Sequence, residues 1–259
     1  MTDPRPHLAE VAPLSGYRSV CALTGAGISA AAGLPTFRGP DGLWTLDPEL
    51  ERALDGSLVP GNIALMWRAW GTIYAAAIAA GPTDAHRTLA DAGATVVTQN
   101  IDTLHSLAGS DPIELHGSAG IACCSRESAH WRSAVSVHPE DGLAAPGGVY
   151  VAGAAEAADG VPACPVCAAP ARQEIVLFGE SLPAQALQAA IAAAGECDLF
   201  LAIGTSGTVA PASELAGIAR AGGAHCINVV LHPDTVPNPA FHQQVIGDAQ
   251  AELPAWRCS

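Results

Sequence analysis

Residues 20–29, VCALTGAGIS, decide the fold of this chain. A short apolar run ends at Leu23, a turn with Gly25 and Gly27 follows, and the alanine-rich segment after the turn is predicted to be helical. This strand–glycine turn–helix order offers backbone N–H groups to a phosphate, and glycine permits the close approach of a pyrophosphate. The signal is weak alone, because Gly33 comes too late for the full dinucleotide fingerprint and no acidic residue lies about twenty positions on. A glycine turn that closes an ordinary strand–helix unit is the alternative interpretation.

Small and polar residues also follow other apolar runs of the sequence. TQNID (98–102) follows the run 95–97, ELHG (114–117) comes soon after it, GTS (204–206) ends the run 199–203, and Asn228 lies within the run 226–231. In an open parallel sheet, the carboxyl ends of the strands form the edge at which ligands bind. The sequence therefore predicts that these runs bring small and polar residues to one ligand.

The apolar runs divide the chain into two structural parts. Residues 1–35, 81–118 and 172–259 alternate apolar runs with helix-like segments, which predicts a doubly wound, Rossmann-like parallel sheet of the α/β class. Residues 36–80 and 119–171 are predicted to form a smaller inserted domain, made of a helical insertion and a cysteine-bearing module. Within the module, the glycine- and alanine-rich piece 142–160 is expected to be a poorly regular loop.

The composition indicates a compact globular protein. Of the 259 residues, 49% are hydrophobic and 14% are charged, which is typical of a chain that buries a sizeable core. Residues 1–13 hold no apolar signal-peptide core, and apolar helix-like stretches such as 73–80 are too short to span a bilayer. We therefore expect a cytoplasmic protein without membrane contact, whose eight cysteines bind metal or stay as buried thiols.

The acidic balance of the chain limits its partners. A formal net charge of −14 argues against the phosphate-neutralising contacts that drive nucleic-acid binding. The same charge suits attraction to cationic protein segments. A solubilising acidic surface is the simpler explanation of it.

Seven motifs, taken in order along the chain, resemble the sirtuin family. They are GAGIS (25–29), PTFRG (35–39), TQNID (98–102), LHGS (115–118), FGE (178–180), GTS (204–206) and IN (227–228). The resemblance implies an NAD-dependent enzyme that removes acyl groups from protein lysines and releases nicotinamide and O-acyl-ADP-ribose. Proteins with acylated lysines are then the expected partners, and the sequence makes no prediction about the oligomeric state.

The resemblance also implies roles for individual residues. His116 would act as general base on a ribose hydroxyl once nicotinamide has left, and a group that titrates near neutral pH suits this role. Asn100, the second predicted catalytic residue, and Gln99 would contact the ribose. Asp102 and the backbone of Ile101 would hold the nicotinamide carboxamide. The other residues expected around NAD, where Phe37 would exclude water, are Gly25, Ala26, Gly27, Ser29, Thr36, Phe37, Arg38, Gly204, Thr205, Ser206, Asn228 and Ala249.

Expectations about the substrate follow from the same resemblance. The segments that receive a substrate peptide as an added strand correspond to Phe178, Gly179, Glu180 and Val209. Family members that prefer acidic acyl groups carry a tyrosine and an arginine three residues apart, whereas the corresponding residues here are Trp70 and Ile73. Without that cation, a buried succinyl carboxylate would be unpaired, which is costly. We therefore expect an apolar acyl pocket and a preference for acetyl or another neutral acyl group.

The metal module departs from the family pattern of two CxxC pairs. The second pair is present as Cys164 and Cys167, whereas the first is incomplete because Glu127 stands three positions after Cys124. The resemblance implies a structural zinc on Cys124, Cys164 and Cys167. The sequence leaves the fourth ligand open among Cys123, Glu127 and His130. A vestigial module without metal is the alternative.

Two other functions stay open at the level of the sequence. One is an NAD glycohydrolase or mono-ADP-ribosyltransferase, which would use the same pocket with water or another nucleophile. The other is a non-catalytic NAD-sensing module. The FGE segment (178–180) and His116 favour the deacylase over the first, and the presence of Asn100, Asp102 and His116 together argues against the second.

Overall fold

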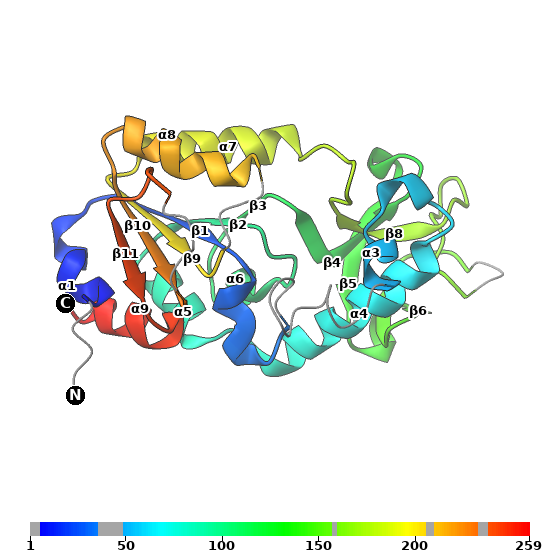
Figure 1. The fold of residues 1–259 in the computed structure, drawn as a ribbon. Coiled ribbons are helices and arrows are strands. Elements are labelled where there is room, and N and C mark those ends of the chain that lie inside the picture. Colours follow the sequence, from blue (N-terminus) through cyan, green and yellow to red (C-terminus); the bar gives the residue numbers. More distant parts are fainter. Residues whose placement is uncertain (1–5, 36–48, 157–159, 206–209, 233–237) are drawn as a thin grey trace.

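Six short strands form one parallel sheet in the order β11–β10–β9–β1–β2–β3 (Figure 1). The computed structural model describes residues 6–35, 49–156, 160–205, 210–232 and 238–259. Every neighbouring pair of these strands is parallel, so their carboxyl ends lie at one edge of the sheet. The strands are β1 (Val20–Thr24), β2 (Thr95–Thr98), β3 (Ile113–Glu114), β9 (Leu199–Ile203), β10 (His225–Val230) and β11 (Gln243–Ile246).

The central strands bury side chains on both faces of this sheet. In β1, Val20 and Ala22 belong to one hydrophobic core, whereas Cys21 and Leu23 belong to a second. This is why the central strands read as continuous apolar runs. Helices cover the two faces (Figure 1) and confirm the predicted doubly wound fold. One face carries α1 (Leu8–Val11), α5 (Asp84–Asp91) and α9 (Ala249–Arg257), and the other carries α7 (Ala184–Glu196) and α8 (Leu215–Ala221).

The strand order reverses direction at β1. The chain continues from β1 to β2 and β3 on one side, and later returns through β9, β10 and β11 on the other side. Such a reversal opens a crevice at the carboxyl ends of the strands, where ligands bind in this class of fold. The glycine turns that follow β1 and β9 therefore both lie at this switch point.

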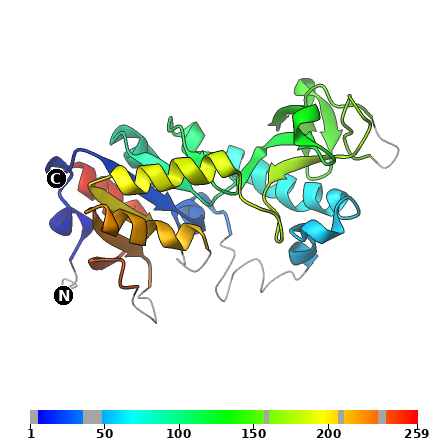
Figure 2. The same cartoon turned by 90° about the horizontal axis from the view of Figure 1, so that it is seen from above.

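A second sheet of five strands lies at the other end of the elongated molecule (Figures 1 and 2). Its order is β6–β7–β5–β4–β8, and its neighbouring strands are antiparallel. The strand β4 begins three residues after β3 ends, so the two sheets are continuous in sequence at residues 115–116. The strands are β4 (Gly117–Cys124), β5 (Arg132–Ser136), β6 (Leu143–Ala145), β7 (Val149–Val151) and β8 (Ala171–Ile175).

The expectation of a poorly regular loop at 142–160 is wrong for its first half. A hairpin of β6 and β7 occupies this part of the chain, and Val149 and Val151 are fully buried in the core of the second sheet. Its turn contains Gly147 and Gly148 at positive φ, a conformation that glycine adopts without strain. The low complexity of the sequence therefore gave no sign of this hairpin, in which Val149 and Val151 both pack into the core.

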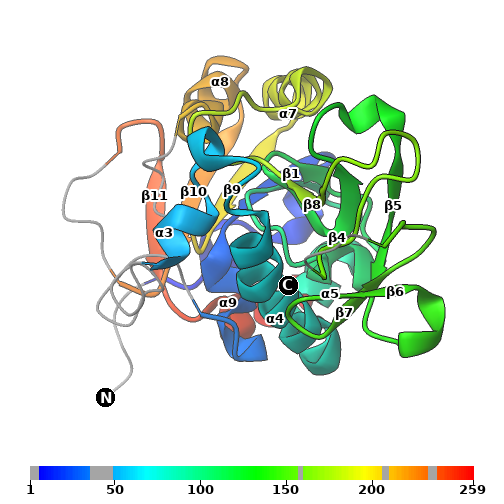
Figure 3. The same cartoon turned by 90° about the vertical axis from the view of Figure 1, so that its right-hand side faces the viewer.

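The helical insertion packs against the second sheet (Figure 3). It contains α3 (Glu49–Ala53), the short 3₁₀ helix η3 (Gly56–Leu58) and α4 (Ile63–Ala80). With 18 residues, α4 is long and apolar enough to cross a membrane by length and composition, which corrects the expectation that such stretches are too short. One face of α4 nevertheless lies in the protein core, where Trp67 and Trp70 are fully buried and Trp67 Nε1 donates to Ala171 O at 2.8 Å.

The remaining short elements are α6 (Leu104–Leu107), η1 (Leu14–Gly16), η4 (Ser128–His130), η5 (Pro139–Asp141) and η6 (Ala212–Glu214). All eight cysteines lie in the described part of the chain, and all are free thiols.

Candidate functional site

The two glycine turns at the switch point touch through their backbones. Gly27 N donates to Gly204 O at 3.0 Å. A Cβ atom at Gly25 would lie 2.8 Å from Gly204 O, and one at Gly27 would lie 2.6 Å from Gly204 Cα. Both positions therefore require glycine so that the turns can meet. The predicted helix after the first turn is η2 (Ala26–Ala32), a 3₁₀ helix.

A buried hydrogen-bond network follows β2 and reaches the first turn. Asn100 Nδ2 donates to Gly25 O at 3.1 Å and to Ser29 Oγ at 3.2 Å. Ser29 Oγ donates to Asp102 Oδ2 at 2.7 Å, and Leu104 N donates to Asp102 Oδ1 at 3.0 Å. Ser29, Asn100 and Asp102 are each more than nine-tenths buried. Because the Asn100 amide nitrogen is committed inside the protein, its Oδ1 is the atom left for a ligand.

Two buried histidines, His86 and His105, lie next to this network. Burial raises the pKa of Asp102, and the hydrogen bonds from Ser29 and Leu104 oppose that rise. His86 Nε2 lies 3.5 Å from Ser29 Oγ, and the His86 and His105 rings meet edge-on at 4.5 Å. Burial lowers the pKa of His86 to about 4 and that of His105 to about 3. Both histidines are therefore neutral near pH 7 and place no positive charge beside Asp102.

His116 lies at the junction of the two sheets. Its Nδ1 is 2.9 Å from Gln99 O, and because a carbonyl only accepts, Nδ1 carries the proton and Nε2 is left as an acceptor. Gln99 Nε2 donates to Thr205 Oγ1 at 2.8 Å, which links His116 to the second glycine turn. Burial lowers the pKa of His116, and the hydrogen bond to Gln99 opposes that shift. The neutral form of the imidazole is thus favoured at pH 7.

Other residues predicted around NAD also lie at the carboxyl edge of the six-stranded sheet. They are half-buried or buried, and they comprise Ala26, Ile101, Gly204, Thr205 and Ala249, whereas the buried Asn228 lies inside β10. Five predicted residues lie outside the described part of the chain, namely Thr36, Phe37, Arg38, Ser206 and Val209.

The predicted peptide-binding segment has a fixed backbone and an exposed ring. Phe178 N donates to Leu54 O at 2.7 Å, and Gly56 N donates to Phe178 O at 3.1 Å. The Phe178 side chain is 57% exposed, and Gly179 adopts a positive φ of 89°. The helical insertion therefore fixes this segment while leaving the aromatic ring open to solvent.

The glutamate of the same segment is held by an arginine that the sequence analysis did not select. Arg172 donates to both carboxylate oxygens of Glu180, at 2.7 and 2.8 Å, and Leu177 N donates to Glu180 Oε2 at 2.9 Å. Burial works against the ionised carboxylate, but the Arg172 pair keeps the pKa of Glu180 below its usual value. Glu180 thus shapes the turn, since its charge is already neutralised. The only sign of this ion pair in the sequence was an arginine eight residues before the glutamate.

The residues predicted to line an acyl pocket lie on α4. Trp70 is fully buried in the core of the second sheet, and Ile73 is half-buried against the same core. Arg68 lies on the exposed side of the helix. The face that carries Trp70 and Ile73 is therefore apolar.

Three potential metal ligands meet near the end of β4. Cys124 Sγ, His130 Nδ1 and Cys167 Sγ lie within 4.8 Å of one another, with Cys124 Sγ at 3.5 Å from Cys167 Sγ and 4.0 Å from His130 Nδ1. Ligand atoms around a tetrahedral zinc lie roughly 3.5–3.8 Å apart, so the three atoms fit a zinc ion. Burial opposes the Cys124 thiolate, but backbone hydrogen bonds from Glu127 and Arg126 lower the Cys124 pKa to about 6. The thiolate is the form that binds metal.

The other cysteines and the acidic residue of this module take different positions. Cys164 is fully buried beside the group, in a hydrophobic cluster with Cys124 against which Cys167 packs. Of the three residues left open as an additional ligand, His130 joins the group. Cys123 alternates to the other face of β4, where burial raises its pKa to about 11, and the Glu127 carboxylate caps η4. The geometry therefore groups Cys124, Cys167 and His130, and the predicted ligand Cys164 lies beside this group and not within it.

The structure therefore has two candidate sites. The first is a ligand site at the switch point of the doubly wound sheet, and the second is the potential metal site of Cys124, His130 and Cys167 in the inserted sheet. The model of the Sir2 family matches residues 25–211. A relative from Pseudomonas aeruginosa, NAD-dependent protein deacylase 1, is 37% identical over 255 residues, covering 95% of this chain and 96% of the relative. NAD-dependent protein deacylase 2 from Archaeoglobus fulgidus is 36% identical over 264 residues, covering 98% and 95%. The chain belongs to the Sir2 family and is a sirtuin-type enzyme.

Solved structures of Sir2 proteins share this fold. A Sir2 homologue in complex with ADP-ribose has a TM-score of 0.79 at 26% identity and covers 95% of this chain and 93% of its own. A complex of Sir2 with a p53 peptide and NAD+ has a TM-score of 0.72 at 28% identity, with 94% of each chain covered. The likeness therefore extends over both sheets.

Proposed function

We propose that this chain removes acetyl or another neutral acyl group from lysine side chains of proteins, with release of nicotinamide and O-acyl-ADP-ribose. The chain is an NAD-dependent protein deacylase by its family, since its relatives are named NAD-dependent protein deacylases and deacetylases. The observation that carries the finer proposal is the His116–Gln99 hydrogen bond of 2.9 Å. It fixes the imidazole in the tautomer that a general base requires.

His116 would receive one proton in this reaction. With NAD and an acylated lysine bound, the acyl oxygen would attack the ribose carbon that carries nicotinamide. The bond between this carbon and nicotinamide would break as the new bond forms. His116 Nε2 then accepts the proton of a ribose hydroxyl, whose oxygen attacks the acyl carbon, and water completes the release of the lysine amine. The lowered pKa of His116 keeps Nε2 unprotonated near pH 7, so it is ready to act as a base.

Asn100 and Asp102 would orient the ribose and the nicotinamide. The Asn100 Nδ2 bonds to Gly25 and Ser29 turn its Oδ1 outward as an acceptor for a ribose hydroxyl. Each Asp102 oxygen accepts one internal hydrogen bond and keeps capacity for another, which a carboxamide N–H would use. Because both side chains are held before a ligand arrives, little reorganisation is needed on binding.

The preference for a neutral acyl group rests on α4. Trp70 is buried in the core and Ile73 is half-buried against it, so this face of α4 carries no cation for an acidic acyl group at either position. A succinyl carboxylate buried there would lose its hydration without gaining a charged partner. Acetyl and other uncharged acyl groups carry no such penalty.

Zinc would support the second sheet and take no part in the reaction. Cys124, His130 and Cys167 would hold it, and Cys164, beside Cys167, would complete a set of three thiolates and one imidazole. The ion would supply bonds between β4, η4 and the 164–167 turn, where the hydrophobic cluster of Cys124, Cys164 and Ala169 is small.

The direct test measures nicotinamide release with an acetyl-lysine peptide, a succinyl-lysine peptide and no peptide. We expect release that requires the acetyl peptide and is at least about tenfold slower with succinyl. In His116→Ala, steady-state deacylation should fall by a factor on the order of 10²–10⁴, while nicotinamide is still released at most once per active site. His138→Ala, at an exposed histidine of the second sheet, is the matched control and should keep full activity.

Two outcomes would overturn the proposal. Nicotinamide release that needs no peptide would identify an NAD glycohydrolase. Full deacylation by His116→Ala would show that the imidazole is not the base of the reaction.

A further inference from the structure

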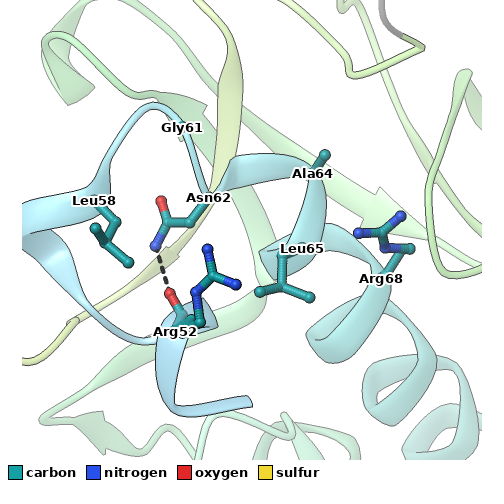
Figure 4. Close-up of a pocket in the computed structure, with 7 residues that line it drawn as sticks. All are labelled: Arg52, Leu58, Gly61, Asn62, Ala64, Leu65 and Arg68. Carbon is teal, nitrogen blue, oxygen red and sulfur yellow. Dashed lines mark hydrogen bonds between the residues drawn. The ribbon is translucent and has the colours of Figure 1, made fainter. Parts of the chain in front are cut away.

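A cavity of about 370 Å³ lies outside the site described above, on the outward face of the helical insertion (Figure 4). Its α4 wall uses residues 64, 65 and 68, on the side of the helix away from Trp67 and Trp70, which pack into the core. The walls also include Leu58, at the end of η3, which is 39% exposed. The lining residues are Arg52, Leu58, Gly61, Asn62, Ala64, Leu65 and Arg68.

The cavity is a positively charged spot on an acidic protein. Among the residues that the structure describes, its lining contains two arginines and no acidic residue, although the chain has 25 acidic and only 11 basic residues. Figure 4 shows the guanidinium groups of Arg52 and Arg68 on either side of Leu65. The Arg68 guanidinium makes no ion pair with any residue in the described ranges. All 11 basic residues of the chain are arginines, so acylation of lysines or a change of pH cannot remove this charge.

The chemistry of the cavity suits a carboxylate on a short apolar stem. Arginine binds carboxylates through two parallel N–H···O bonds, and such charge-assisted bonds are stronger than neutral ones. Ala64, Leu58 and Leu65 offer apolar contacts for the methylene groups of the same side chain. Aspartate and glutamate side chains combine these two features.

The cavity is joined by hydrogen bonds to the segment expected to receive the substrate peptide. Asn62 Nδ2 donates to Arg52 O at 2.8 Å and to Asp55 O at 3.0 Å. The next residue, Gly56, donates its N–H to Phe178 O at 3.1 Å. The backbone of residues 55 and 56 therefore joins the wall of the cavity to the segment beside which the substrate peptide is expected to bind.

We propose that this cavity binds an aspartate or glutamate side chain of the protein substrate, close in sequence to the acylated lysine. This proposal rests on the deacylase function proposed above, because it names the substrates that the enzyme prefers. The net charge of −14 repels long acidic segments at a distance, so the cavity selects a single acidic residue at short range. Charge complementarity of this kind contributes selectivity more than affinity.

The test uses a set of acetyl-lysine peptides in which one flanking position at a time is glutamate or glutamine. At one position, glutamate should raise kcat/KM about fivefold over glutamine at low salt, and less at high salt. The combined Arg52→Gln and Arg68→Gln variant should lose this difference and keep its activity on the glutamine peptides. Arg18→Gln, at a 96% exposed arginine elsewhere on the surface, is the control and should retain the difference.

Binding of the same peptides, labelled and followed by fluorescence anisotropy, separates this proposal from the deacylase proposal. Binding that depends on glutamate and on the two arginines, without turnover, would refute the reaction and support the cavity. Deacylation with equal glutamate and glutamine rates in both wild type and the double variant would overturn the cavity proposal. The cavity proposal would also be overturned if the double variant changed only the rate on the succinyl-lysine peptide. The arginines would then contact the acyl group and not a flanking residue.

Discussion

The carboxyl edge of the six-stranded sheet and the cysteine cluster of the five-stranded sheet differ in how their polar groups are satisfied. At the edge, Ser29, Asn100 and Asp102 bind one another and the backbone through hydrogen bonds of 2.7–3.2 Å. In the cluster, the Cys124 and Cys167 sulfur atoms approach to 3.5 Å with only weak hydrogen bonds between them. The side chains of the edge are held in place without a ligand, whereas the cluster would gain most of its bonds from a metal ion.

This difference teaches which substitutions should affect activity and which should affect folding. The edge residues lie on a sheet that is buried on both faces by two large cores, so changing one of them alters the ligand site while the scaffold remains. The cysteine cluster instead lies against a small hydrophobic group of its own, made of Cys124, Cys164 and Ala169. Removal of a ligand there should loosen the sheet itself.

The largest effect is expected from loss of a metal ligand. Purified wild-type protein should contain about one zinc per chain, and His130→Ala should lose it and melt roughly 10 °C lower, because metal binding contributes directly to folding. The measurement is zinc content by mass spectrometry together with the melting temperature. Glu127→Ala, at the neighbouring residue that caps η4, is the control and should keep its zinc. Zinc lost from Glu127→Ala but retained by His130→Ala would reverse the ligand assignment.

A smaller effect, confined to activity, is expected at the edge. Asp102→Asn should lower kcat/KM for NAD about 100-fold with little change in melting temperature, since the amide keeps the Leu104 contact but removes the carboxylate charge. Initial rates and thermal unfolding of the same preparation would check this. Asp198→Asn, just before β9 at the opposite edge of the sheet, should leave kcat/KM near the wild-type value. Equal losses in both variants would show that the effect is structural.

The smallest effect is a shift in the pH profile. His116 must be neutral to act as a base, and burial holds its pKa below the ordinary value of 6.5. The rate should therefore be constant near pH 7 and decline only below pH 6.5, about tenfold for each unit below the midpoint. Initial rates between pH 5 and about 8, at saturating substrates and with the fraction folded measured at each pH, would locate the midpoint. A midpoint above 6.5 would contradict the burial argument.

The two regions are also connected to each other. Ala119 N, in β4, donates to Ile101 O at 2.9 Å, and the fully buried Gln173 in β8 donates its Nε2 to Ala119 O at 3.3 Å. The register of β4 and β8 shifts between residues 118 and 122, so Gln173 satisfies a carbonyl that the irregular ladder leaves unpaired. The second sheet thus supports the loop that carries Asp102.

The sequence alone was sufficient for features that are local along the chain. The apolar runs ending at Leu23, Val97 and Ile203 predicted buried parallel strands, because a strand covered on both faces must be apolar throughout. The residues directly after those strands were correctly expected at the carboxyl edge of the sheet, because parallel strands end at the same edge. The hairpin at 143–151 was missed, since its short strand 149–151 follows a run of alanine, proline and glycine and is recognised only when it pairs with β5 and β6.

Only the tertiary structure decided which distant residues meet. Gly25 and Gly27 need to be glycine because they pack against Gly204, about 180 residues later in the chain. His130 joins Cys167, and Arg172 holds Glu180, because β4, η4 and β8 bring them together. Sequence fixes residue chemistry and local periodicity, whereas such contacts depend on strand pairing and helix packing over the whole chain. The physical reason is that a contact between remote residues forms only after the core has set their distance and direction.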